Sequence, residues 1–130
     1  MSAFTVAVKN QPGELARVCA AMAEHGVNLV VCGLSHGGNG TIAFIADDEA
    51  AARIALDRAG IEFTERPALT VRMENVPGAG AATFRRLADA GVNMDLLLPI
   101  RVSNEQFFAV ICTDDVDAAS RALGEQIVSD

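Results

Sequence analysis

Two short stretches of the sequence have the residue types and spacing to bind a carboxylate through the peptide backbone. Asn10–Leu15 reads NQPGEL and Asn75–Gly80 reads NVPGAG, and each stands between a strand-like run and a helix-like run. The first N–H groups of a helix have no intrahelical acceptor and lie at the positive end of the helix dipole. Backbone N–H groups at Gly13-Glu14-Leu15 and at Gly78-Ala79-Gly80 are therefore candidate donors to a carboxylate.

The same proline-glycine pair also has a purely structural interpretation. Pro12 suits the first position of a helix, where its missing N–H costs no hydrogen bond, and Gly13 permits close approach of other groups. Every helix start has free N–H groups, so the turn alone does not separate a binding site from a simple turn.

The two turns belong to an internal duplication that covers nearly the whole chain. A shift of 65 residues superposes them and also places Gly26-Val27-Asn28 on Gly91-Val92-Asn93. After the second strand the shift becomes 67, so the second copy carries a two-residue insertion. Each copy is long enough for one small module. We expect two modules, residues 1–66 and 67–130, joined by a short connection that favours fixed packing.

Hydrophobic periodicity predicts the same order of elements in both copies. In the first copy it indicates strands over 4–9, 27–34, 41–46 and 61–63, a hairpin turn over 35–40, and helices over 13–25 and 47–59. The first helix is expected to bury Leu15, Val18, Cys19 and Met22. The order βαββαβ predicts an α+β fold of two ferredoxin-like modules, each an antiparallel sheet with both helices on one face.

The second strand is apolar on both faces, which bears on assembly. Val27, Leu29 and Val31 alternate with Val30, Cys32 and Leu34, and the second copy has Leu97 and Pro99 at the last two positions. We expect the uncovered sheet faces to pack together, within the chain or in a homodimer.

Composition and charge argue against several classes of function. The formal charge of 10 − 17 = −7 disfavours nucleic-acid binding, and no apolar run is long enough for a membrane span. No charged leader segment is present, so we expect a cytoplasmic protein. The three cysteines have no close pairing, which indicates reduced thiols and no metal site.

No cofactor and no enzymatic activity are expected. Gly78–Thr83 approximates a dinucleotide fingerprint, but Thr83 occupies the last small-residue position and the preceding strand alternates. The pairs Asp47-Asp48 and Asp114-Asp115 are typical of helix N-termini. Neither histidine has a sequence-evident partner, so no nucleophile and base are brought together.

The duplicated segments NQPGELARVCAAMAEHGVNL and NVPGAGAATFRRLADAGVNM each resemble the opening of an ACT domain. That opening has a strand, an Asn/Asp-x-Pro-Gly turn, an amphipathic helix, and Gly-Val-Asn before the second strand. The resemblance covers nearly the whole chain as a tandem pair without a catalytic domain. It implies an allosteric regulatory protein, because many ACT domains bind an amino acid between the turn of one module and the second strand of its neighbour.

The resemblance assigns candidate ligand-binding residues in both copies. The turn positions are Asn10, Gln11, Gly13, Glu14 and Leu15 in the first copy and Asn75, Val76, Gly78, Ala79 and Gly80 in the second; the strand entries are Asn28 and Asn93. Asp95 is a candidate for the ligand's ammonium, since it shares a strand face with Asn93. Its alternative role is that of a solvated charge.

Two departures from the family bear on the ligand. Leu34 and Pro99 stand where amino-acid kinases with such domains often have Gln, and Val8 and Met73 stand where serine-sensing relatives carry His. Both departures leave the identity of the ligand open. The second turn is smaller and neutral, so it is the better candidate if only one turn holds ligand.

The leading hypothesis is a non-enzymatic protein that binds an amino acid between ACT modules and signals to a partner. The alternative is a ligand-free regulatory subunit or scaffold that binds an amino-acid metabolic enzyme, as the similar first turn of the small subunit of acetohydroxyacid synthase implies. An enzyme of ferredoxin-like fold is the third possibility.

Overall fold

A computed structural model describes residues 1–128, and these form two compact units. One unit is Ser2–Arg66, and the other runs from Pro67 onward and includes Met1. Met1 belongs to the second unit because its carbonyl oxygen accepts a hydrogen bond from the Ala68 N–H at 3.0 Å. The second module was expected to extend to residue 130. Residues 129 and 130 lie outside the described residues.

Both units have the predicted βαββαβ order. The first contains β1 Ser2–Lys9, α1 Glu14–Glu24, β2 Leu29–His36, β3 Asn39–Ala46, α2 Glu49–Arg58 and β4 Thr64–Pro67. The second contains β5 Leu69–Glu74, α3 Ala79–Asp89, β6 Met94–Val102, β7 Gln106–Thr113, α4 Val116–Leu123, the 3-10 turn η1 Gly124–Gln126 and β8 Ile127–Val128.

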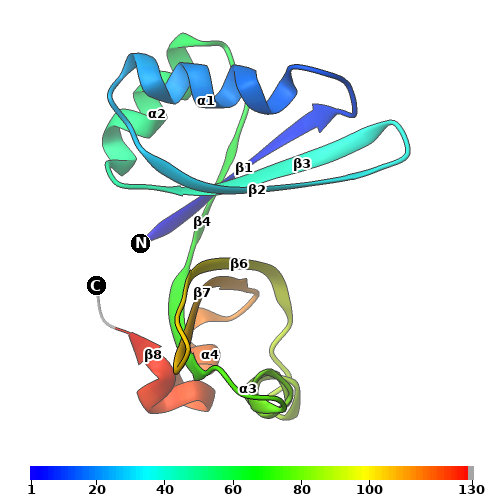
Figure 1. Cartoon of the computed structure of the whole chain (residues 1–130), viewed down its shortest axis with the longest axis vertical. Helices are drawn as coiled ribbons and strands as arrows, with labels where there is room; N and C mark the ends of the chain where they lie inside the picture. Colours follow the sequence, from blue (N-terminus) through cyan, green and yellow to red (C-terminus); the bar gives the residue numbers. More distant parts are fainter. Residues whose placement is uncertain (129–130) are drawn as a thin grey trace. The chain divides into compact units, whose positions relative to one another are not determined.

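Each unit builds a four-stranded sheet, with strand orders β2-β3-β1-β4 and β6-β7-β5-β8. The pairings of β1 with β3, β2 with β3, β5 with β7 and β6 with β7 are antiparallel. In the first unit α1 and α2 lie on one side of the sheet (Figure 1). The predicted α+β fold of two ferredoxin-like modules is therefore confirmed.

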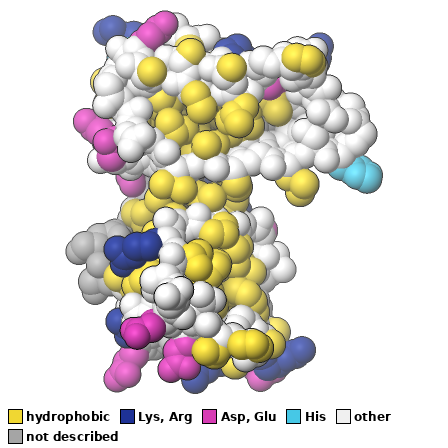
Figure 2. Space-filling model, viewed as in Figure 1, with side chains coloured by type: hydrophobic (Ala, Val, Ile, Leu, Met, Phe, Trp, Pro, Cys, Tyr) yellow, Lys and Arg dark blue, Asp and Glu magenta, His cyan; other side chains and the backbone are white. Residues whose placement is uncertain are grey.

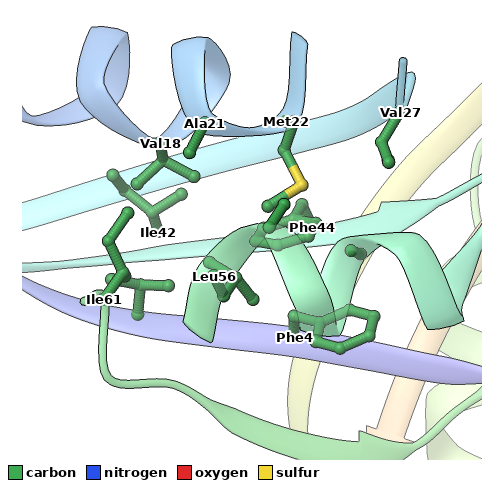
Figure 3. Packing of buried hydrophobic residues seen from close by; sticks show 12 residues of the cluster. Phe4, Val18, Ala21, Met22, Val27, Ile42, Phe44, Leu56 and Ile61 are labelled. Atoms are coloured by element: carbon green, nitrogen blue, oxygen red, sulfur yellow. The ribbon is translucent and has the colours of Figure 1, made fainter. Parts of the chain in front are cut away.

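The core of each module lies between its sheet and its two helices. In the first, Phe4 and Phe44 stack on the sheet below Val18 and Met22 of α1 and Leu56 of α2 (Figure 3). In the second, Val71, Ala109 and Ile111 of the sheet pack against Leu87 of α3 and Leu123 of α4. Because each strand and each helix buries only one face, apolar residues recur at every second position in the strands and at a longer spacing in the helices.

Glycine ends three of the helices in the same way. After α1, Gly26 has φ +67°, its N–H donates to the Ala23 carbonyl, and the Val27 N–H donates to the Met22 carbonyl. This arrangement is a Schellman motif, and the buried Val27 makes the apolar contact that accompanies it. Gly91-Val92 and Gly60-Ile61 repeat it after α3 and α2. The Gly-Val-Asn signature thus encodes a helix end.

Three local predictions are wrong. The fourth strand of the first copy is at Thr64–Pro67, because Ile61 belongs to the helix cap and fills the core. Pro12 precedes the helix, which begins at Glu14 with Gly13 as its N-cap. Leu15 is 45% exposed, because the buried stripe of α1 starts one turn later and consists of Val18, Ala21 and Met22.

The two-residue insertion in the second copy is absorbed by β6. Its pairing with β7 changes register between Met94 and Leu96 and again between Pro99 and Arg101, one residue each time. Each shift is the signature of a β-bulge, which also reverses the alternation of side chains. Leu97 therefore packs toward the helices, and the expectation that it faces away from them is wrong. In the first copy Val30 and Leu34 do face away from the helices, as expected, since Leu34 is 80% and Val30 39% exposed.

No helix among residues 1–128 is long and apolar enough to cross a bilayer. Within the same residues no group of His, Cys, Asp or Glu is placed to hold a metal ion. Apolar side chains reach the surface of each unit (Figure 2), including Ile54, Val76 and Val102 in addition to Leu34.

Candidate functional site

Each proline-glycine turn is held in place by its asparagine. The Asn10 side-chain amide donates to the Gly37 carbonyl oxygen at 3.0 Å, and its backbone N–H donates to the Gly38 carbonyl oxygen at 2.9 Å. In the second copy the Asn75 amide donates to the Ser103 carbonyl oxygen at 2.6 Å, and its backbone N–H donates to the Glu105 carbonyl oxygen at 2.9 Å. The asparagine therefore ties the turn to the neighbouring hairpin, and it positions the site before any ligand arrives.

The glycine of each turn is required by the backbone. Gly13 has φ +93° and Gly78 has φ +89°, both in the left-handed region and both at the N-cap of the following helix. Neither cap supplies a side-chain hydrogen bond to the first-turn N–H groups of α1 and α3. The Ala79 N–H instead donates to the Val76 carbonyl oxygen at 3.3 Å. Any side chain at these two positions strains the backbone, whatever space surrounds it.

The first turn already carries an anion of its own. The Glu14 carboxylate accepts hydrogen bonds from the Gln11 amide at 2.8 Å and from the Arg17 guanidinium at 3.0 Å. The Arg17 hydrogen bond, followed by that of Gln11, lowers the pKa of Glu14 below its usual value. Glu14 is thus ionised at neutral pH, and its carboxylate lies at the helix start, where it is paired with the Arg17 guanidinium.

The second turn, NVPGAG, has no charged residue and borders a mostly apolar pocket in which Glu74 is the one charged lining residue. The pocket has a volume of about 250 Å³ and is lined by Met73, Glu74, Asn75, Val76, Gly80, Phe84, Leu97 and Phe107. A Cβ at Gly80 would lie 3.5 Å from the Phe84 ring, which is an ordinary contact distance, so a side chain larger than Ala would extend into the pocket. The first copy has the larger Leu15 at the equivalent position.

The strand-entry asparagines lie elsewhere in their own modules. The Asn28 N–H donates to the Asp47 carboxylate at 3.0 Å, and the Asp47 N–H donates back to the Asn28 carbonyl. Asn93 and Asp114 repeat this exchange at 2.9 and 3.1 Å. Asn10 meets the start of β3 and Asn28 its end, so about 25 Å of strand separates them within a module.

The ten predicted turn residues therefore lie in two groups of five, one at each turn. Asn28, Asn93 and Asp95 do not lie at the turn of their own module. Asp95 is exposed and occupies the first bulge of β6, where it has no opposite residue on β7. The apolar lining from Phe84, Leu97 and Phe107 was missed by sequence reasoning. One sequence feature could have indicated this lining: Gly80 stands at the position that aligns with the larger Leu15 of the first copy.

Known proteins share the fold of this chain at low sequence identity. The chain matches no model of a known protein family, and no curated protein matches it in sequence. A protein from Bacteroides thetaiotaomicron aligns over 98% of this chain and 90% of its own, with 22% identity and a TM-score of 0.85.

Two aspartate kinase regulatory subunits are also similar. That of Thermus thermophilus, in its ligand-free form, aligns over 96% of this chain and 91% of its own with 22% identity and a TM-score of 0.71. That of Thermus flavus aligns over 96% and 90% with 23% identity and a TM-score of 0.66. These two subunits share the fold of this chain, which is the fold that the ACT resemblance of the two turns implies.

Proposed function

We propose that this protein is an amino-acid sensor that binds a small apolar amino acid beside its second turn and passes the bound state to a partner. The observation that carries the proposal is the asymmetry between the two turns. The second turn has no charged residue and borders a mostly apolar pocket of about 250 Å³, in which Glu74 is the one charged lining residue. The first turn has Leu15 in place of Gly80 and carries the ion pair of Glu14 with Arg17. The fold shared with regulatory subunits of aspartate kinase supports a regulatory role over a catalytic one.

In the proposed complex the ligand carboxylate accepts hydrogen bonds from the N–H groups of Gly78 and Gly80. The Ala79 N–H joins them only when it leaves the Val76 carbonyl oxygen, to which it donates at 3.3 Å. The ligand side chain enters the pocket between Val76 and Phe84. Asn or Asp side chains of a neighbouring module, such as Asn93 or Asp95 of a second copy in a homodimer, hold the ammonium. Binding shifts module packing because the ligand prefers one arrangement over the other.

The test is thermal unfolding of the full chain against each common amino acid. A ligand at about 100-fold its dissociation constant adds roughly 2.7 kcal/mol to the free energy of unfolding. We expect one or a few apolar amino acids to raise the melting temperature. The absence of a shift with all of them refutes the sensing function.

The matched variants are Gly80→Leu and Ala88→Leu. Gly80→Leu copies the first turn and fills the pocket, so the ligand shift disappears. Ala88 is an exposed position of the same helix outside the pocket, so the shift is kept. In α3, Gly80→Leu introduces a better helix former, and Ala88→Leu exchanges one good helix former for another at an exposed position, so neither threatens the fold.

The second candidate is a regulatory subunit that binds an enzyme of amino-acid metabolism and no amino acid. The likeness to aspartate kinase regulatory subunits along nearly their whole length favours it. A stable enzyme captured on the immobilised chain, in the absence of any amino-acid response, selects this function over sensing.

A further inference from the structure

A second hollow of the unit that begins at Pro67 is lined by arginines; it adjoins the turn pocket, with which it shares Met73 and Glu74. It has a volume of about 830 Å³ and lies between the end of β5, one side of α3, the end of α4, and η1. Ala79, Thr83 and Arg86 face it from α3, whereas Gly80 and Phe84 face the turn pocket from an adjoining side of that helix. All of its lining residues belong to one unit.

The hollow lies where β8 stops pairing with β5 before β5 ends. β8 pairs Ile127 with Val71, and the next position, which would face Arg72, is Gln126 of the 3-10 turn. The Gln126 side chain replaces the missing strand: its amide donates to the Arg72 carbonyl oxygen at 3.3 Å and to the Thr83 hydroxyl at 2.8 Å. Thr83 is 3% exposed, so this link forms part of the interior.

The polar link also orients one cation. The Arg86 guanidinium donates to the Gln126 side-chain oxygen at 2.8 Å, which uses one of its five N–H donors. Arg72 and Arg121 line the same hollow, and among residues 1–128 neither of them, nor Arg86, forms an ion pair with a carboxylate. Three guanidinium groups thus gather at one hollow of a chain whose net charge is −7.

The internal duplication provides a comparison within the molecule. The shifts of 65 and 67 residues place Ala7, Val18, Ala21, Ile54 and Ala59 of the first copy on Arg72, Thr83, Arg86, Arg121 and Gln126. The three arginines, Thr83 and Gln126 are thus replaced by apolar residues in the other copy. The fold needs none of these polar groups, since the first module has the same order of strands and helices without them.

The geometry points to a binding site for a phosphate-bearing small molecule in this hollow. Guanidinium groups match the oxygens of phosphate in geometry and charge. Glu74 and Glu125 also line the hollow, and their carboxylates accept hydrogen bonds from hydroxyl or amino groups of the same ligand. The ligand class is therefore a phosphate ester with hydroxyl or amino donors, and a simple anion lacks the second set of contacts.

The test is titration calorimetry of the full chain with glycerol 3-phosphate, O-phosphoserine, inorganic phosphate and malonate at constant ionic strength. We expect the two esters to bind more tightly than inorganic phosphate, and malonate to bind least. Arg72→Ala and Arg121→Ala each weaken ester binding by about tenfold or more, the loss typical of a hydrogen-bonded charge. Both residues are exposed and make no ion pair, so circular dichroism should show an unchanged fold.

Arg85→Ala is the matched control, because Arg85 is an exposed arginine of α3 outside the hollow. The inference is overturned if no phosphate-bearing probe binds, if malonate binds as tightly as the esters, or if Arg85→Ala weakens binding as much as Arg121→Ala. Failure of every amino acid to bind the turn pocket leaves this result unaffected, because the two pockets lie on different sides of α3.

Discussion

At the scale of single residues, the turn motif separates into positions that fix the backbone and positions that shape the site. Asn10 and Asn75 fasten the turns to the hairpins, and Gly13 and Gly78 supply the left-handed N-cap. Gly80 has an ordinary helical conformation and instead provides space beside Phe84. Glycines two residues apart in NVPGAG therefore have different functions, and substitution separates them.

Alanine at Gly78 and at Gly80 is expected to have opposite effects on stability. Gly78→Ala places a Cβ on a left-handed residue and costs roughly 1–2 kcal/mol of unfolding free energy. Gly80→Ala lies within a helix and gains up to about 1 kcal/mol. Urea denaturation of both variants measures the difference. Equal stabilities would show that the left-handed cap is not strained by a side chain.

Sequence reasoning identified the turn residues but not their geometry. The spacing of Asn, Pro and Gly predicted both turns because these residue types have few conformations available. Pro12 was predicted at the first helical position, two positions too late, since its suitability for a helix start does not reveal that Gly13 caps the helix. The lining from Phe84 and Leu97 depends on packing between elements and on a bulge, neither of which leaves a local signal.

At the scale of elements, the two aspartates of each pair, Asp47-Asp48 and Asp114-Asp115, accept different hydrogen bonds. Asp48 and Asp115 cap α2 and α4, each accepting a hydrogen bond from the N–H three residues later at 3.0 and 2.9 Å. Asp47 and Asp114 instead accept from the N–H groups of Asn28 and Asn93 and so join the start of the second strand to the end of the third. The predicted placement at helix N-termini is confirmed, and the first aspartate of each pair adds a link across the sheet.

Removing a cap should destabilise its module. Asp115→Ala is expected to lower the unfolding free energy by about 1 kcal/mol, the usual cost of a lost N-cap. Asp89→Ala is the control, because Asp89 lies at the opposite end of a helix and caps nothing. Chemical denaturation gives the unfolding midpoint of each variant. Equal midpoints for Asp115→Ala and Asp89→Ala would contradict the capping role.

The first module alone joins α2 to β4 through charges. The Arg53 guanidinium donates to both Glu65 carboxylate oxygens, with the Nε distance at 2.8 Å, and it also pairs with Glu49 at 3.5 Å. The hydrogen bond from Arg53 lowers the pKa of Glu65 to about 2 from its usual 4.5. The aligned position of Arg53 in the second copy is Ser120, so this pair has no counterpart there.

The Glu65 pair predicts a pH dependence of a defined sign. A carboxyl group whose pKa is depressed in the folded state stabilises fully above its unfolded value, and this stabilisation is lost as pH falls from about 4.5 toward 2. Glu65→Gln should therefore be less stable than the parent at pH 7, and the difference should shrink below pH 4.5. Urea midpoints across this range test it, with Glu62→Gln as the exposed control. A difference that stays constant with pH would exclude the pair as its source.

At the scale of the whole molecule, duplication explains both the shared fold and the divergence of sites. The element order of both modules followed from periodicity, since one buried face per strand or helix leaves a regular pattern. The two bulges of β6 were visible only as a two-residue insertion, whose location depends on pairing with β7. The arginine-lined hollow combines residues from β5, α3 and α4, so only the comparison of aligned copies could have signalled it.

Self-association is predicted from the outward side of β2. Leu34 is 80% exposed, so its replacement cannot cost core packing, and we propose that a second copy covers it in a homodimer. Light scattering should give a dimeric mass for the parent and a lower mass for Leu34→Gln. Ile54→Gln, at another exposed apolar position, should leave the dimer intact. A monomeric parent would remove this proposal.

The most direct test of the sensing function is calorimetric titration of the parent chain, Gly80→Leu and Glu14→Ala with the amino acid that gives the largest thermal shift. The asymmetry of the two turns predicts one site per chain in the parent, no binding to Gly80→Leu, and unchanged binding at the second turn in Glu14→Ala. Binding that survives Gly80→Leu, or that is lost in Glu14→Ala alone, would contradict a ligand site at the second turn.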